Sequence, residues 1–171
     1  MRAEYYPIAN VPSGRLAVMP RPRAGDWLAD EIASWRDEGL DVVVSLLEES
    51  EVAELGLERV PELCAKAGMR FISFPIPDRG VPASRSELSN LVKSLAEELR
   101  QGRGVGLYCR FGVGRSALVA VCLLVQLGRP LDEAWADVEQ ARGMAVPETE
   151  EQRQWAASWA GGGGTAADLF A

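Results

Sequence analysis

The segment from Cys109 to Ser116 reads CRFGVGRS and combines a nucleophilic side chain with glycines and arginines. Gly112 and Gly114 permit backbone conformations with positive φ, so that successive N–H groups could point inward and form an anion-binding nest. Arg115 would present a guanidinium fork to two oxygens of the same anion, which lysine could not do. The spacing therefore predicts an oxyanion cradle with a sulfur atom at its base.

The same positive field should favour the ionised form of Cys109. The loop is expected to run into a helix, whose N-terminal N–H groups and dipole attract negative charge. A free thiol is only slightly ionised at neutral pH, and a helix N-terminus with a nearby arginine increases that fraction. We therefore expect Cys109 to act as a thiolate nucleophile. Ser116 could donate a hydrogen bond to the sulfur, although serine at a helix start is also a common cap.

Asp78 is the leading candidate for a general acid that protonates a leaving oxygen. It follows a strand predicted over Phe71 to Ile76, and parallel neighbouring strands would place its loop at the same sheet edge as Cys109. An aspartate close to glycine and proline is also common in ordinary turns, and Asp78 taken alone leaves that interpretation open. Its position beside the Cys109 loop favours the acid role.

The elements that must position these residues alternate between strands and helices. Strands are predicted at residues 16–19, 41–47, 69–76 and 105–108. Helices are predicted at residues 26–38, 48–67 with a break near Gly56, 84–102, 115–127, 130–142 and 148–159. The alternation predicts an α/β fold with a central, largely parallel sheet flanked by helices. Cys109 then falls where a strand ends and a helix begins, the edge at which open α/β sheets bind ligands.

Length and composition favour one domain in a reducing compartment. The 171 residues suggest a single domain over residues 1–160, followed by a flexible glycine-rich tail at residues 161–171. Three widely spaced cysteines argue against a disulfide framework, and no signal peptide is recognisable. The longest apolar run is nine residues, about half of what a membrane span needs. We expect a cytoplasmic protein, a monomer without membrane insertion.

The charge balance and the absence of histidine exclude several classes of function. A net charge of −7 disfavours a nucleic-acid partner, which would require a basic surface. The chain contains no histidine, which removes Ser-His-Asp and Cys-His hydrolase mechanisms and histidine-based metal sites. Three cysteines are too few for an all-cysteine zinc site. We therefore expect neither a metal nor another cofactor.

The cysteine loop resembles the phosphate loop of the cysteine-dependent protein tyrosine phosphatases. Residues 74–82, reading FPIPDRGVP, are similar to the acid loop of small dual-specificity phosphatases. Within this superfamily the chain looks most like the kinase-associated phosphatase of the cyclin-dependent kinase inhibitor type, from about Asp41 to Trp155. That likeness includes the pair Arg142-Gly143 and the pattern Pro147, Thr149 and Gln152.

The resemblance implies a dual-specificity phosphatase fold and a two-step hydrolysis of a phosphate ester. Cys109 would take the phosphoryl group while Asp78 protonates the departing hydroxyl, and Asp78 would then activate water. Ser116 would stabilise the leaving thiolate. The phosphate would be bound by the loop residues Arg110, Phe111, Gly112, Val113, Gly114 and Arg115.

One position departs from the family pattern. Tyr108 stands where the family usually has histidine, which helps to organise the loop and to keep the sulfur ionised. This departure predicts a weaker or pH-shifted enzyme and keeps open a non-catalytic, phosphate-binding adaptor on the same fold.

Two substrate classes remain beside the adaptor alternative. The first is phosphoprotein, with phosphotyrosine as the main target and phosphoserine and phosphothreonine as further candidates. The second is a phosphoinositide or another small phosphate. Arg110 is the one basic residue among the variable loop positions, and headgroups with several phosphates usually require more cations. The sequence thus favours a phosphorylated protein as the partner.

The remaining conspicuous residues are expected to be structural. Cys64 and Cys122 lie on apolar helix faces and should be small core residues. Trp155 and Trp159 are expected to dock the last helix. The acidic cluster is expected to be a solvated helix face; it comprises Glu48, Glu49, Glu51 and Glu54.

Overall fold

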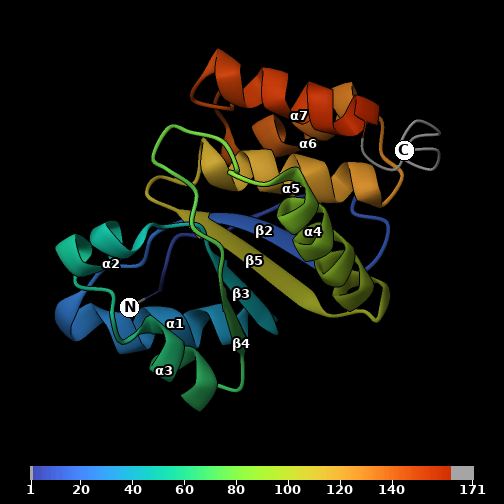
Figure 1. Cartoon of the computed structure of the whole chain (residues 1–171). Helices are drawn as coiled ribbons and strands as arrows, with labels where there is room; N and C mark the ends of the chain where they lie inside the picture. The colour runs from blue at the N-terminus through green and yellow to red at the C-terminus, as the bar shows by residue number, and fades with distance from the viewer. Residues whose placement is uncertain (1, 163–171) are drawn as a thin grey trace.

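A five-stranded sheet forms the centre of the computed structural model, which describes residues 2–162 (Figure 1). Its strand order is β1-β2-β5-β3-β4, and all neighbours are parallel except the pair of β1 with β2. The strands are β1 (Tyr6–Pro7), β2 (Arg15–Pro20), β3 (Val42–Ser45), β4 (Arg70–Ser73) and β5 (Gly104–Cys109). The predicted α/β fold with a largely parallel sheet is confirmed. The two-residue edge strand β1 was not predicted.

Helices cover both faces of the sheet, as parallel strands require (Figure 1). One face carries α4 (Arg85–Arg100), α5 (Arg115–Gln126), α6 (Leu131–Arg142) and α7 (Glu150–Gly162). The other carries the 3₁₀ turn η1 (Gly25–Trp27), α1 (Leu28–Asp37), α2 (Glu49–Leu55) and α3 (Val60–Lys66). Each face buries its own apolar cluster. The segment of residues 48–67 forms two helices, α2 and α3. Gly56 ends α2 because it adopts the left-handed conformation (φ 68°).

Helix α5 is the centre of the larger cluster. Its first ten residues, 115–124, are all buried, because the helix lies against β2 and β5 and is surrounded by α4, α6 and α7. The helix predicted at residues 115–127 is thus present, and it forms part of the core. Trp159 docks α7 onto this layer, since its indole Nε1 donates a 3.0 Å hydrogen bond to Ser89 Oγ on α4.

The carboxyl ends of the parallel strands meet at one edge of the sheet. Cys109 at the end of β5 is in register with Pro20 at the end of β2. The N–H of Leu46, just after β3, donates to the carbonyl of Tyr108 at 2.9 Å. The N–H of Ile76, after β4, donates to the carbonyl of Leu46 at 3.0 Å. The loops that follow β3, β4 and β5 are therefore adjacent.

Two expectations concern the end of the chain and the membrane. The expected domain end at residue 160 falls inside α7, which continues through Gly162; the rest of the predicted tail lies outside the described residues. Within residues 2–162, no helix combines the length and the apolar character that crossing a bilayer requires.

Cys64 and Cys122 are free and buried, as expected of small core residues. Burial raises the pKa of the Cys64 thiol to about 12 and raises that of Cys122 as well.

The two faces of α4 should respond differently to truncation. Leu95 is fully buried, so Leu95→Ala should lower the free energy of unfolding by about 2–5 kcal/mol. Lys93→Ala, on the exposed face of the same helix, should change it by less than about 0.5 kcal/mol. Urea unfolding followed by circular dichroism measures both. Equal losses for the two variants would contradict this assignment of the core.

Candidate active site

The loop between β5 and α5, residues 110–114, is where the sequence predicts an anion-binding nest. Among residues 2–162, no carbonyl or side chain accepts a hydrogen bond from the backbone N–H groups of residues 110–114. Gly112 has a φ of 72°, and a Cβ there would lie 2.7 Å from Met19 C and 2.8 Å from Pro20 N. Both the backbone conformation and the close approach to β2 therefore require glycine at this position.

Gly114 is required for a different reason from the one that the sequence suggested. Its φ is −97°, so the expected positive φ is wrong at this residue. A Cβ on Gly114 would instead collide with Glu148 Oε1 and lie 3.1 Å from Gln152 Nε2. The loop thus needs glycine here because the segment before α7 packs directly against it.

Cys109 lies at the base of this loop, with only 1% of its surface exposed. The Cys109 thiol donates to Ser116 Oγ at 3.2 Å, and the backbone N–H of Ser116 donates to the sulfur at 3.5 Å. Ser116 is fully buried. A serine hydroxyl can donate as well as accept, so it can turn its proton toward the sulfur once the thiol is ionised.

The Arg115 guanidinium is buried, and both of its Nη atoms are hydrogen-bonded. Its Nη1 donates to Glu51 Oε1 at 2.6 Å and to the carbonyl of Ile76 at 2.9 Å. Its Nη2 donates to Glu51 Oε2 and to Asp78 Oδ1, both at 3.0 Å. The Arg115 side chain is 1% exposed, so these contacts are screened very little by water.

One donor of Arg115 has no partner within residues 2–162. Among the described residues, the buried side-chain nitrogens and oxygens without a hydrogen bond are Arg115 Nε and Trp35 Nε1. Leaving a buried donor unsatisfied is costly, and such groups in native proteins call for an explanation. An oxyanion in the adjacent nest would satisfy Arg115 Nε.

Glu51 is the residue that the sequence analysis missed. It was expected on a solvated helix face, but only 5% of its surface is exposed. Both oxygens of its carboxylate accept hydrogen bonds from the guanidinium of Arg115. Burial by itself raises the pKa of Glu51. Hydrogen bonds from Arg115, the Glu48 N–H and Arg110 outweigh this effect, so the pKa is lowered to about 2. The detectable signal was a Glu48-x-x-Glu51 capping box directly after a strand that ends at the site.

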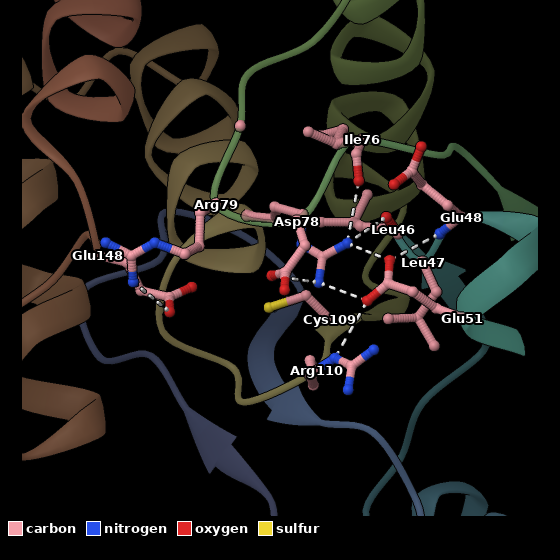
Figure 2. Close-up of polar contacts among 12 residues, drawn as sticks. Leu46, Leu47, Glu48, Glu51, Ile76, Asp78, Arg79, Cys109, Arg110 and Glu148 are labelled. Carbon is pink, nitrogen blue, oxygen red and sulfur yellow. Dashed lines mark hydrogen bonds and ion pairs between the residues drawn. The ribbon is translucent and has the colours of Figure 1, made fainter. Parts of the chain in front are cut away.

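Asp78 lies on the loop after β4, next to the buried guanidinium (Figure 2). Its side chain is 44% exposed, so the carboxyl group is also accessible to solvent. The structure therefore brings together Asp78, Cys109, Arg115 and Ser116, the four residues to which the sequence analysis gave chemical roles.

The side chains of the loop itself point away from the nest. Arg110 is held by Glu51 at 3.2 Å and by Glu54 at 3.5 Å. Phe111 is 58% exposed, and Val113 packs against the larger apolar cluster. An anion bound in the predicted nest would therefore meet the backbone N–H groups of these residues.

Arg142 supports this loop from outside. Its guanidinium donates to the carbonyl of Gly112 at 3.0 Å and to that of Phe111 at 3.4 Å. The guanidinium also lies over the ring of Tyr6, 3.9 Å from the ring centroid. In the sequence, Arg142 stood out only as part of the family resemblance, and no local pattern indicated these contacts.

Tyr108 lies on the opposite face of the sheet from Cys109, because consecutive strand residues alternate in direction. Its ring packs against Trp35 with centroids 5.6 Å apart, inside the smaller apolar cluster. Burial raises the pKa of Tyr108, so its phenol stays neutral. The expected effect of this residue on the activity stays a prediction.

Comparison with known proteins agrees with this geometry. The chain is 34% identical to rat cyclin-dependent kinase inhibitor 3 over 104 residues, which are 58% of this chain and 49% of that protein. It is 30% identical to bovine protein tyrosine phosphatase domain-containing protein 1 over 102 residues, 55% of this chain and 13% of that protein. The chain thus spans half or less of the length of these curated relatives.

The fold also matches a solved structure over nearly its full length. A kinase associated phosphatase with its catalytic-site cysteine replaced by serine superposes with a TM-score of 0.84. The match covers 93% of this chain and 94% of that one, at 18% sequence identity, so it speaks for the fold. Residues 17–129 match the profile of a family described as Tc-R-P, polymorphic toxin system, DSP-PTPase phosphatase. The profile covers about two thirds of the chain, which therefore belongs to the DSP-PTPase phosphatase family of polymorphic toxin systems.

Proposed function

We propose that this protein is a phosphoprotein phosphatase that hydrolyses phosphotyrosine, with phosphoserine and phosphothreonine as further substrates, through a cysteinyl-phosphate intermediate. Cys109 is the nucleophile, Asp78 the general acid and base, and Arg115 the phosphate-binding side chain. Ser116 stabilises the thiolate when it leaves. The backbone N–H groups of residues 110–114 complete the phosphate site.

The reaction has two steps, the transfer of the phosphoryl group to Cys109 and the hydrolysis of the resulting cysteinyl phosphate. In the first, the Cys109 sulfur forms a bond to phosphorus, the ester P–O bond breaks, and Asp78 gives its proton to the departing oxygen. In the second, Asp78 takes a proton from water as the water oxygen bonds to phosphorus. The S–P bond then breaks, and inorganic phosphate and the Cys109 thiolate are released.

The unpaired Nε of Arg115 is the observation that carries this proposal. Arg115 directly follows the loop whose five backbone N–H groups, at residues 110–114, have no acceptor within residues 2–162. Such donors close to a cysteine sulfur are suited to a ligand with several negative oxygens. The neighbouring Nη2 contacts Asp78, an exchangeable partner on a loop. Nε and Nη2 together form the fork that binds two oxygens of one phosphate.

The location of Asp78 supports its role as the acid. It is bound to the same guanidinium that would hold the phosphate, so its carboxyl group lies within reach of the leaving oxygen. The chain contains no histidine, which is the most frequent general acid in enzymes, and Asp78 is a partly exposed carboxyl group bound to Arg115. The Ser116 hydroxyl at 3.2 Å from the sulfur supports thiolate stabilisation in the second step.

The charges around the loop favour a substrate with one phosphate. Arg110, the basic residue at a variable loop position, is engaged by Glu51 and Glu54. Arg142 is engaged by loop carbonyls. A headgroup with several phosphates would need such cations free, and the net charge of −7 opposes an anionic membrane. A protein substrate is therefore favoured over a phosphoinositide.

Cys109→Ser should abolish the hydrolysis of para-nitrophenyl phosphate, because the alcohol is a far weaker nucleophile than the thiolate. Cys64→Ser, which replaces a buried cysteine on α3 away from the site, should retain activity and serves as the control. A panel of phosphopeptides and phosphoinositides then identifies the substrate class, with phosphotyrosine peptides expected to be the best. Wild-type protein that binds phosphate without turnover would be an adaptor and would refute the proposal.

Glu51→Gln should lower kcat at neutral pH and destabilise the fold by about 3 kcal/mol, because it leaves the buried Arg115 charge without its partner. The pKa of Glu51 is lowered to about 2 in the folded state, so its ionised form stabilises the protein above about pH 4.5. That contribution is lost as the pH falls toward 2. The stability difference between wild type and variant should therefore shrink in acid, as urea unfolding at neutral pH and at about pH 3 would measure. A difference that is constant with pH would contradict the ion pair.

Gly112→Ala and Gly68→Ala provide a matched test of the nest. Both glycines have positive φ, but a Cβ on Gly68 meets nothing within 4 Å, whereas one on Gly112 meets the β2 backbone. Gly112→Ala should lose catalysis and the binding of tungstate, a phosphate analogue. Gly68→Ala should retain both and lose only about 1 kcal/mol of stability. Tungstate titration by calorimetry makes the comparison, and intact binding in Gly112→Ala would argue against the nest.

A further inference from the structure

The two residues that follow Asp78 contact the first turn of α7 and the segment just before it. Arg79 Nη1 lies 3.6 Å from Glu148 Oε2 (Figure 2). Gln152 Nε2, from the first turn of α7, donates to the carbonyl of Gly80 at 3.1 Å. The acid loop is thus anchored at two points to a part of the chain that the proposed chemistry does not use.

The anchor on the α7 side is rigidly built. Gln152 is fully buried, and its Oε1 accepts hydrogen bonds from the N–H groups of Glu148 at 3.1 Å and Thr149 at 3.2 Å. Glu148 is 17% exposed, and its other carboxylate oxygen packs against Gly114 of the phosphate loop. The carboxylate that Arg79 meets is therefore fixed relative to the nest.

Arg79 itself adopts an uncommon backbone conformation. Its φ of 59° lies in the left-handed region, which residues other than glycine seldom occupy. Such a conformation persists only where surrounding contacts hold it. A hydrogen bond from the Gly80 N–H to the carbonyl of Pro77, at 2.8 Å, closes a turn over residues 77–80 and accommodates this conformation. The Arg79–Glu148 ion pair and the hydrogen bond from Gln152 Nε2 to the Gly80 carbonyl attach that turn to the α7 side.

Catalysis requires an anchor of this kind, because the contact that Asp78 makes cannot survive substrate binding. Asp78 is bound to Arg115 Nη2, the donor that a phosphate oxygen would take. As a general acid, Asp78 must also be protonated, and it then carries no charge to attract the guanidinium. The loop must therefore be kept over Cys109 by contacts that do not involve Arg115.

We propose that the Arg79–Glu148 ion pair is a latch that positions the general acid, so that Arg79 and Glu148 are positioning residues for the reaction; this inference rests on the proposed function. The latch links the acid loop to the segment that also packs on Gly114. The position of Asp78 relative to the phosphate site is thereby kept while Arg115 Nη2 exchanges Asp78 for a phosphate oxygen.

Breaking the latch should affect the loop and leave the overall fold intact. The Arg79 side chain is 62% exposed, and ion pairs this exposed add little to global stability. A misplaced acid matters most when the leaving group is a poor one. Phenyl phosphate, whose leaving phenol has a pKa of about 10, depends on protonation far more than para-nitrophenyl phosphate does.

The experiment compares kcat/KM on these two substrates for Arg79→Ala, Glu148→Gln and the double variant. Arg85→Ala is the matched control, because Arg85 contacts Ser158 on the same helix α7 but lies outside the acid loop. The latch variants should lose at least about tenfold more on phenyl phosphate than on para-nitrophenyl phosphate. The double variant should lose no more than either single one, because all three break the same contact. Asp78→Asn sets the upper limit of the selective loss.

Hydrogen exchange of the loop tests the latch independently of activity. In Arg79→Ala and Glu148→Gln, the peptide covering residues 77–82 should exchange faster, while the melting temperature and the exchange of α4 stay as in Arg85→Ala. Equal losses on both substrates, or unchanged exchange of the loop, would overturn the latch while the proposed function stands. If the loop exchanges faster in the variants but the wild-type protein shows no Cys109-dependent turnover, the contact would stand, and both its catalytic role and the proposed function would be overturned.

Discussion

The buried guanidinium of Arg115 is the interaction on which the rest of the site depends. A charge removed from water is stable only if it is paired and its donors are satisfied. Glu51 supplies the countercharge with both oxygens, and the carbonyl of Ile76 takes a further hydrogen bond. Burial alone would lower the pKa of Arg115, but Glu51 raises it above its ordinary value, so the group stays charged. Helix α2 is therefore part of the site although it carries no reacting group.

The arrangement of charges keeps the site ready for an anion without leaving it unbalanced. Glu51 is a permanent partner, since its carboxylate is buried and its pKa is about 2. Asp78 is exchangeable, since it is half exposed and lies on a loop. A phosphate group can thus replace one negative partner of Arg115 while the other keeps the guanidinium in place. The two carboxylates thus explain how a buried arginine can keep its charge and still have one partner that an anion could displace.

The parallel sheet brings the parts of the site together. Because parallel strands all end at the same edge, the segments after β3, β4 and β5 meet there. They carry Glu51 on α2, Asp78 on its loop and the loop of residues 110–114. Strand alternation then separates Cys109, which faces the loop, from Tyr108, which packs with Trp35 on the other side. The residue that replaces the usual histidine is thus part of the core beneath the site.

Local sequence signals were sufficient for the strand-loop-helix unit around Cys109, because turn glycines, apolar runs and helix starts are encoded within a few residues of each other. They also indicated Asp78, since the order of strands along a parallel sheet brings its loop to the same edge. The burial of Glu51 and the contacts of Glu148 and Arg142 were decided only by the tertiary structure. A glutamate in an acidic helix start looks solvated until a guanidinium from a distant segment is placed against it. The need for glycine at position 114 likewise arises from Glu148, a neighbour in space that no local pattern specifies.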